Sequence, residues 1–107
     1  MPHYMLQVAY TPEAWAAQIK SPQDRVQAIR PAVEKLGGKV EGAWYSFGEY
    51  DIMALLEMPD NVSAAAFAVA AAAGGAVKSV KTTPLMTVQE GIEALRKAGG
   101  AGYRPPS

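Results

Sequence analysis

Hydrophobic and polar positions alternate over residues 3–10, His-Tyr-Met-Leu-Gln-Val-Ala-Tyr, near the start of the chain. Tyr4, Leu6, Val8 and Tyr10 fall on one side of this alternation. A period of two residues is typical of a β-strand with one face against a core. We therefore predict a first strand over residues 3–10.

Three more segments have the pattern of strands. Residues 39–47 and 50–58 are predicted to form a hairpin with a short turn at Gly48-Glu49, in which Gly48 takes the positive φ. The strand over 50–58 is almost entirely apolar, which indicates burial on both faces. Residues 76–83 mix lysines with apolar residues, so we expect an edge strand there.

Between these strands, apolar residues recur three and four positions apart, as on one face of a helix. One helix is predicted to begin at Thr11. A second is predicted to begin within Ser21-Pro22-Gln23-Asp24 and to end at Gly37-Gly38. Pro31 falls inside the second helix. Because the apolar stripe keeps its phase across this proline, we expect a kink and not a break.

The second half of the chain predicts two more helices. One covers about residues 61–73, and its alanine-rich sequence indicates close packing. The other begins at a capping box formed by Thr87 and Glu90 and ends at Gly99-Gly100. Residues 1–98 then make one domain, and residues 99–107 make a tail containing glycine and proline.

The element order β-α-β-β-α-β, followed by a helix, predicts a ferredoxin-like α+β fold. Such a fold is one antiparallel sheet with helices on one face, which leaves the other face open. A large apolar patch on an open face needs a cover, and the simplest cover is a second copy. We therefore expect a homodimer or a larger homo-oligomer. The residues expected on the open face are His3, Met5 and Gln7, or else their alternates, with Trp44, Met53 and Leu55.

Composition narrows the class of protein. The 107 residues carry ten basic and ten acidic side chains, so the net charge is zero and a nucleic-acid partner is disfavoured. No cysteine is present, which removes disulfides and thiolate chemistry. The longest apolar run, residues 63–77, is too short and too rich in alanine to predict a membrane span. We expect a cytoplasmic protein with neither nucleic-acid nor membrane partners.

The segment over residues 36–60 resembles the GYD domain family, which is named for a glycine, a tyrosine and an aspartate at this hairpin. Here they would be Gly48, Tyr50 and Asp51. The likeness covers roughly residues 3–96. It implies the dimeric α+β barrel fold but supplies no reaction, since the family has no well-established activity. Proteins of similar barrel fold include cofactor-free monooxygenases, isomerases, haem-binding enzymes and ligand-sensing domains.

The candidate chemical groups each allow a structural alternative. His3, the only histidine, could act as a general base or a haem ligand, or it could be a solvated residue at the chain end. Tyr50 and Asp51 could be an acid–base pair, or they could simply belong to a turn. Consecutive strand residues point to opposite faces, so these two cannot readily share one pocket. Trp44 could line an aromatic pocket or lie in a core or interface.

These observations favour a domain that self-associates and binds a small, largely apolar molecule between sheet faces. The residues expected to line that site are His3, Gln7, Trp44, Asp51 and Met53. One alternative is a cofactor-independent enzyme, an isomerase or monooxygenase, with His3 or Asp51 as base and Tyr50 as a further catalytic candidate. Another is a purely structural assembly module. No metal site and no cofactor are predicted.

Overall fold

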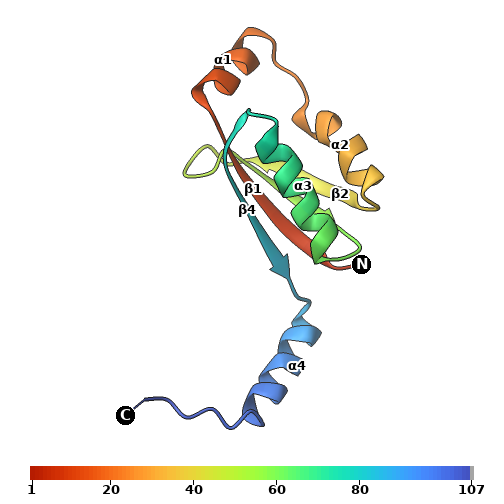
Figure 1. The fold of residues 1–107 in the computed structure, drawn as a ribbon, viewed down its shortest axis with the longest axis vertical. Coiled ribbons are helices and arrows are strands. Elements are labelled where there is room, and N and C mark those ends of the chain that lie inside the picture. The colour runs from red at the N-terminus through yellow and green to blue at the C-terminus, as the bar shows by residue number, and fades with distance from the viewer. Residues whose placement is uncertain (107) are drawn as a thin grey trace.

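A computed structural model describes residues 1–106 of the chain. It contains four strands and four helices (Figure 1). The elements are, in chain order, β1 (His3–Tyr10), α1 (Pro12–Lys20), α2 (Arg25–Lys35), β2 (Lys39–Tyr45), β3 (Ile52–Glu57), α3 (Asn61–Ala73), β4 (Val77–Leu85) and α4 (Val88–Gly99).

The four strands form one antiparallel sheet in the order β2-β3-β1-β4. Helix α2 packs along β2 and α3 packs along β4, so both cover the same face of the sheet (Figure 1). This arrangement confirms the predicted ferredoxin-like α+β fold. Strand β4 lies at an edge, as its mixed polarity predicted. We call the face turned away from α2 and α3 the open face.

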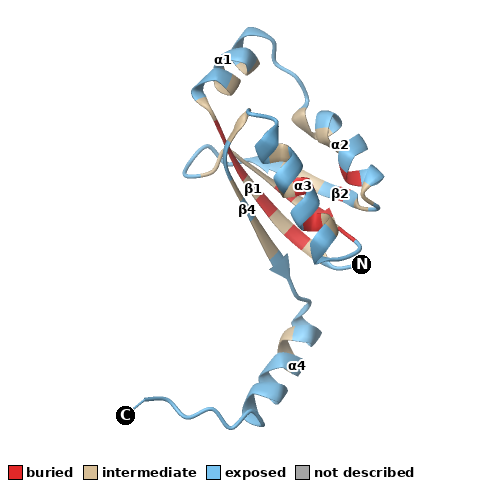
Figure 2. Cartoon of the chain, viewed as in Figure 1, coloured by how far each residue is buried: buried red, intermediate tan, exposed pale blue. Residues whose placement is uncertain are grey.

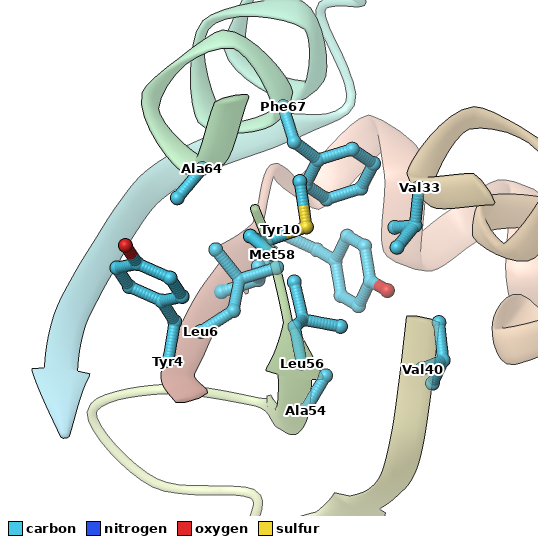
Figure 3. Packing of buried hydrophobic residues seen from close by; sticks show 11 residues of the cluster. Tyr4, Leu6, Tyr10, Val33, Val40, Ala54, Leu56, Met58, Ala64 and Phe67 are labelled. Carbon is cyan, nitrogen blue, oxygen red and sulfur yellow. The ribbon is translucent and has the colours of Figure 1, made fainter. Parts of the chain in front are cut away.

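The core lies between the sheet and these two helices (Figures 2 and 3). Tyr4, Leu6 and Val8 of β1 are buried there, so the alternation of the first strand is confirmed. Phe67 of α3 is also buried among them. The Tyr4 hydroxyl donates a hydrogen bond of 2.6 Å to Asn61 Oδ1, which satisfies its polar atom at the edge of the core.

Helix α2 continues through Pro31 from Arg25 to Lys35. Asp24 stabilises the first turn of the helix, because its Oδ1 accepts hydrogen bonds from the free N–H groups of Val26 and Gln27. On the core side, Val33 is fully buried. This packing keeps the helix continuous across the missing proline N–H, as the unbroken apolar stripe predicted.

The connection between β2 and β3 differs from the prediction. It spans residues 46–51, so the expected short turn at Gly48-Glu49 is wrong. Phe47 takes the positive φ, at 48°, and Gly48 does not. The reason is the hydrogen bonding inside the loop: the N–H groups of Ser46 and Phe47 both donate to the Asp51 carbonyl. A wider loop therefore replaces the tight turn.

Strand β3 is not fully buried on both faces within one chain. Ala54 and Leu56 face α2 and α3 and are buried. Met53 and Leu55 point to the open face and are only half-buried. Complete burial of the second face, as predicted, would need a cover that one chain does not supply.

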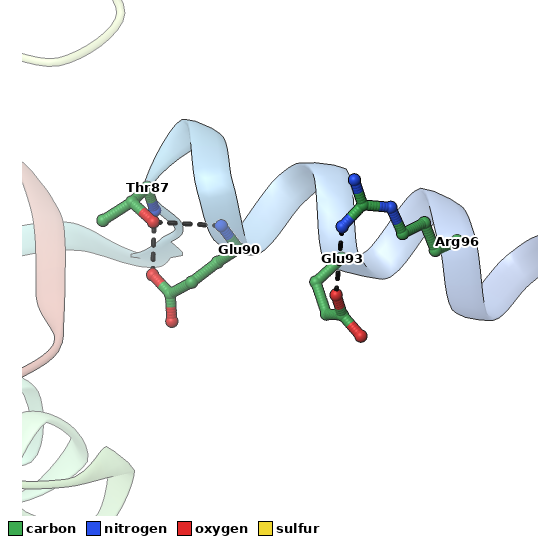
Figure 4. Close-up of polar contacts among 4 residues, drawn as sticks. All are labelled: Thr87, Glu90, Glu93 and Arg96. Carbon is green, nitrogen blue, oxygen red and sulfur yellow. Dashed lines mark hydrogen bonds and ion pairs between the residues drawn. The ribbon is translucent and has the colours of Figure 1, made fainter.

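Helix α4 extends away from the sheet beyond the end of β4 (Figure 1). It begins with the predicted capping box: Thr87 Oγ1 accepts from the Glu90 N–H at 3.0 Å, and Glu90 Oε1 accepts from the Thr87 N–H at 2.9 Å (Figure 4). Glu93 and Arg96 form an exposed ion pair at 3.7 Å further along the helix. On its apolar side, Leu95 is 74% exposed.

This projecting helix gives the chain a Cα radius of gyration of 17.0 Å. Residues 101–106 of the predicted tail follow α4 without a helix or strand, and Ser107 lies outside the described residues. No helix within residues 1–106 has the length and hydropathy needed to cross a membrane.

Candidate functional site

Three of the predicted ligand-binding residues lie in one row across the open face. Strand pairing places Trp44 of β2 opposite Met53 of β3, and Met53 opposite Gln7 of β1. Lys81 of β4 completes the row beside Gln7. The structure therefore brings Gln7, Trp44 and Met53 together, and it gives them a cation at the β4 edge.

The next row makes the centre of the open face apolar. Gly42, Leu55 and Met5 are paired across β2, β3 and β1. Gly42 leaves space for the indole of Trp44, because a Cβ at residue 42 would lie 2.9 Å from Trp44 Cη2. Trp44 is 57% exposed. The open face thus presents an aromatic plane beside two half-buried apolar side chains.

His3 lies one row further, at the end of the open face where β1 begins. Strand β1 rises about 3.3 Å per residue, so His3 and Gln7 are roughly 13 Å apart along it. His3 is paired with Glu57 of β3, and its Nε2 lies 3.6 Å from Glu57 Oε1. The ligand set predicted from the sequence therefore does not form one compact cluster: His3 is at one end of the face, and Gln7 lies toward the other.

Glu41 joins His3 and Glu57 through an irregularity in β2. The register between β2 and β3 shifts between Val40 and Gly42, which is the signature of a β-bulge. As a result, the ligand atoms of His3, Glu41 and Glu57 all lie within 4.8 Å of one another. Imidazole and carboxylate groups at this spacing could hold a divalent cation. The prediction that the chain has no metal site stays a prediction.

The electrostatics of this cluster follow from the same contacts. A hydrogen bond shared with the Glu41 side chain lowers the pKa of Glu57 below its ordinary value of 4.5, and the nearby His3 and Lys39 side chains lower it further. On the other side of His3, the first turn of α4 contributes Thr87 and Glu90 to the same hollow. The Thr87 N–H holds the pKa of Glu90 low. His3 therefore lies between Glu57 and Glu90, two carboxylates whose pKa values are both lowered.

Asp51 has a structural task at the other end of the sheet. Its Oδ2 accepts a hydrogen bond of 2.9 Å from the Tyr10 N–H, at the place where the β1–β4 register shifts. Its own N–H donates to the Val8 carbonyl at 2.8 Å. Asp51 thus joins the hairpin to the end of β1, and it is not beside His3.

The GYD hairpin carries Tyr50 in the loop, before β3 begins. The Tyr50 carbonyl accepts hydrogen bonds from Ser46 Oγ at 2.8 Å and from the Gly48 N–H at 2.9 Å. Both bonds use the backbone of Tyr50. They stabilise the loop and do not involve the Tyr50 hydroxyl, so they give no support to a catalytic role for it.

A group of aromatic rings at this end of the sheet was not predicted as a unit. Trp15 of α1 contacts Tyr10 edge-on, with 5.3 Å between ring centroids. Tyr45 and Phe47 stack in parallel at 5.1 Å, and Phe47 also approaches Trp15 at 6.1 Å. The closely spaced aromatic residues of Trp44-Tyr45-Ser46-Phe47 could have indicated such a group. The contact with Trp15 could not be inferred in this way, because it depends on where α1 packs. Phe47, the residue with the positive φ, thus contacts rings of both the hairpin and α1.

The fold and its hairpin define a class of protein: a small α+β domain with a ferredoxin-like sheet, one face covered by helices and the other bare. The family model of the GYD domain matches residues 4–95. The chain therefore belongs to the GYD domain family, which confirms the resemblance carried by residues 36–60. No match was found among proteins of curated function.

Proposed function

We propose that this GYD domain self-associates through the open face and holds a small, largely apolar molecule between the facing sheets. The observation that carries the proposal is the exposure of Trp44, at 57%, in a row with Met53 and Gln7 on the open face. Removing such apolar surface from water is the main favourable contribution to association. Gln7 would then supply a donor and an acceptor to orient the bound molecule.

A second copy of the chain is the partner that fits this face. Most soluble oligomers are symmetric, and a two-fold axis brings the same patch of both subunits together. The net charge of zero sets no long-range repulsion between two copies. Homodimerisation, or a larger homo-oligomer built on dimers, is therefore part of the proposal.

Sedimentation equilibrium at micromolar concentration tests the dimer. The informative variant is Leu55→Asp, which puts a charge at the centre of the open face. Its matched control is Val69→Asp on α3, because Val69 is 67% exposed on the helical side of the molecule. We expect a dimer for the wild type and for Val69→Asp, and a monomer for Leu55→Asp. A monomeric wild type at micromolar concentration would refute the proposal.

Native mass spectrometry of gently purified protein tests the bound molecule. We expect a dimer with a small adduct, and loss of the adduct in Trp44→Ala. The control is Phe47→Ala, which removes an exposed ring in the hairpin loop outside the row. A dimer without adduct would leave self-association standing and remove the ligand from the proposal. A cytoplasmic location belongs to the same proposal, and cell fractionation checks it.

One observation favours the second candidate, a cofactor-independent isomerase or monooxygenase. His3 Nε2 lies 3.6 Å from Glu57 Oε1, so Glu57 could orient the ring of a general base. Asp51 is less suited to this role, because one of its oxygens already accepts from the Tyr10 N–H. The test is incubation of the recovered adduct with wild type and His3→Gln. Turnover by both at the same rate would exclude His3 as the base.

A further inference from the structure

A cavity of about 320 Å³ lies on the other side of the sheet, between β-strands and helices α2 and α3. Pockets that bind small molecules have volumes of about 300 to 1,000 Å³, so this one suits a ligand of modest size. Leu6, Tyr10 and Phe67, drawn in Figure 3, belong to its walls. None of the residues predicted as site residues lines it.

Alanines create the space. Helix α2 contributes Ala28 and Ala32 to the walls, and α3 contributes Ala70 and Ala71. Protein interiors are otherwise packed as densely as organic crystals, and an unfilled void destabilises the fold in proportion to its volume. Water gains little in such a space, since apolar walls offer it few hydrogen bonds. An apolar molecule would restore the missing contacts.

The polar side chains among the lining residues are Tyr10 and Arg25, and the lining contains no aspartate or glutamate. Burial raises the pKa of Tyr10 above 10.0, although the nearby Arg25 guanidinium acts in the opposite direction. The phenol thus stays a neutral donor near neutral pH. Arg25 forms no ion pair with any carboxylate of residues 1–106. The neighbouring Asp24 carboxylate caps the start of α2 instead.

We propose that this cavity binds a small organic anion with an apolar body, such as a medium-chain or aryl monocarboxylate. Its carboxylate pairs with the Arg25 guanidinium and accepts a hydrogen bond from the Tyr10 hydroxyl. A guanidinium presents paired donors that match the two oxygens of a carboxylate. The apolar body lies against Phe67 and the alanines of α2 and α3. This site is separate from the open face and does not depend on dimerisation.

Isothermal titration calorimetry with octanoate, and with 1-octanol as its uncharged counterpart, tests the assignment. We expect octanoate to bind at least about tenfold more tightly than 1-octanol, because the charge-assisted bonds are lost with the alcohol. Arg25→Gln is expected to weaken octanoate binding at least about tenfold and to leave 1-octanol unchanged. The matched control is Arg30→Gln, which removes the same charge from α2 outside the cavity and is expected to change neither.

A second pair of variants tests whether the ligand binds inside the cavity. Ala71→Leu adds bulk inside the cavity, while Ala65→Leu adds the same bulk to an exposed position of α3. We expect Ala71→Leu to abolish binding of both probes and Ala65→Leu to preserve it, with circular dichroism showing that both variants are folded. Octanoate binding that survives Ala71→Leu, or equal affinities for octanoate and 1-octanol, would overturn the proposal.

The open-face variants separate this inference from the proposed function. Leu55→Asp changes a residue on the opposite side of the sheet, so octanoate affinity should stay within about twofold of the wild type even if that variant is a monomer. Loss of octanoate binding in a folded Leu55→Asp monomer would contradict an independent cavity site.

Discussion

At the scale of single residues, Asp51 shows how one carboxylate can hold two segments of the fold together. The β-bulge at the end of β1 breaks the ladder to β4 near Tyr10. Such a break leaves a backbone group in need of a partner. Asp51 supplies it by accepting from the Tyr10 N–H at 2.9 Å. The aspartate of the GYD hairpin thus has a structural reason to be there.

We therefore expect Asp51→Ala to lower the free energy of unfolding by about 1–3 kcal/mol, because it leaves that N–H without its acceptor. Urea denaturation measures the change. Glu49→Ala serves as the control in the same loop, since Glu49 is exposed and should shift stability by less than about 0.5 kcal/mol. Equal midpoints for Asp51→Ala and wild type would contradict the structural role.

Tyr10 gives a prediction about alkaline pH. Burial, its largest influence, raises the pKa of the folded state above the ordinary value of 10.0. The stability contribution of the neutral phenol is then complete below the unfolded pKa and is lost as pH rises through the folded pKa. NMR titration of the Tyr10 ring should give a midpoint above 10, and Tyr10→Phe should flatten the alkaline loss of stability. A midpoint at 10 would show that the ring is solvated.

Residue positions on the open face were predictable only where the strands are regular. The period of two places Gln7, Met53 and Leu55 on the same side, and the structure agrees. Glu41 could not be placed in this way, because a bulge shifts the register of β2 without an apolar pattern to mark it. Phe47 likewise takes a positive φ that sequence reasoning assigns to glycine.

At the scale of elements, α3 and α4 are helices with similar caps and different surroundings. Asp60 Oδ1 accepts from the Ser63 N–H at 2.8 Å at the start of α3, and Thr87 forms the capping box of α4. Helix α3 buries Ala64 and Phe67 in the core, whereas α4 has no buried residue. Removing either cap should therefore have a different consequence.

Asp60→Ala is expected to lower the global free energy of unfolding by about 0.5–2 kcal/mol, because α3 is part of the core. Thr87→Ala should increase hydrogen exchange within residues 88–99 and leave the global unfolding midpoint unchanged. Hydrogen exchange and urea denaturation of the two variants make the comparison. An equal loss of global stability in Thr87→Ala would mean that α4 is packed on the fold in solution.

The elements themselves were largely predictable, because caps, glycines and periodicity are local signals. Thr11 and Thr87 each cap the helix expected to follow them. Within the start predicted over residues 21–24, Asp24 is the residue that caps α2. The β2–β3 pairing was predicted, but the width of its loop was not predictable, because the loop depends on hydrogen bonds to Asp51 that follow from the register of three strands. The direction of α4 was not predictable either, because a capping box defines where a helix begins and not what it packs against.

At the scale of the whole molecule, the proposed pairing links stability to concentration. A partner that binds only the folded state raises the melting temperature by mass action. The wild type should therefore melt at a higher temperature when the protein is more concentrated, and the Leu55→Asp variant should not. Differential scanning calorimetry over a hundredfold range of concentration checks this. A wild-type melting temperature that does not change with protein concentration would argue against a reversible dimer.

The projecting α4 also affects which methods can determine the number of subunits in the assembly. A compact domain of about 100 residues has a radius of gyration of about 13 Å, and this chain has 17.0 Å. A single copy therefore travels through a gel-filtration column like a heavier globular protein, and its elution volume imitates that of a pair. Sedimentation equilibrium and native mass spectrometry measure mass and therefore count the copies. A gel-filtration column calibrated with globular standards would report an apparent dimer mass for a monomer, because α4 makes the monomer elongated.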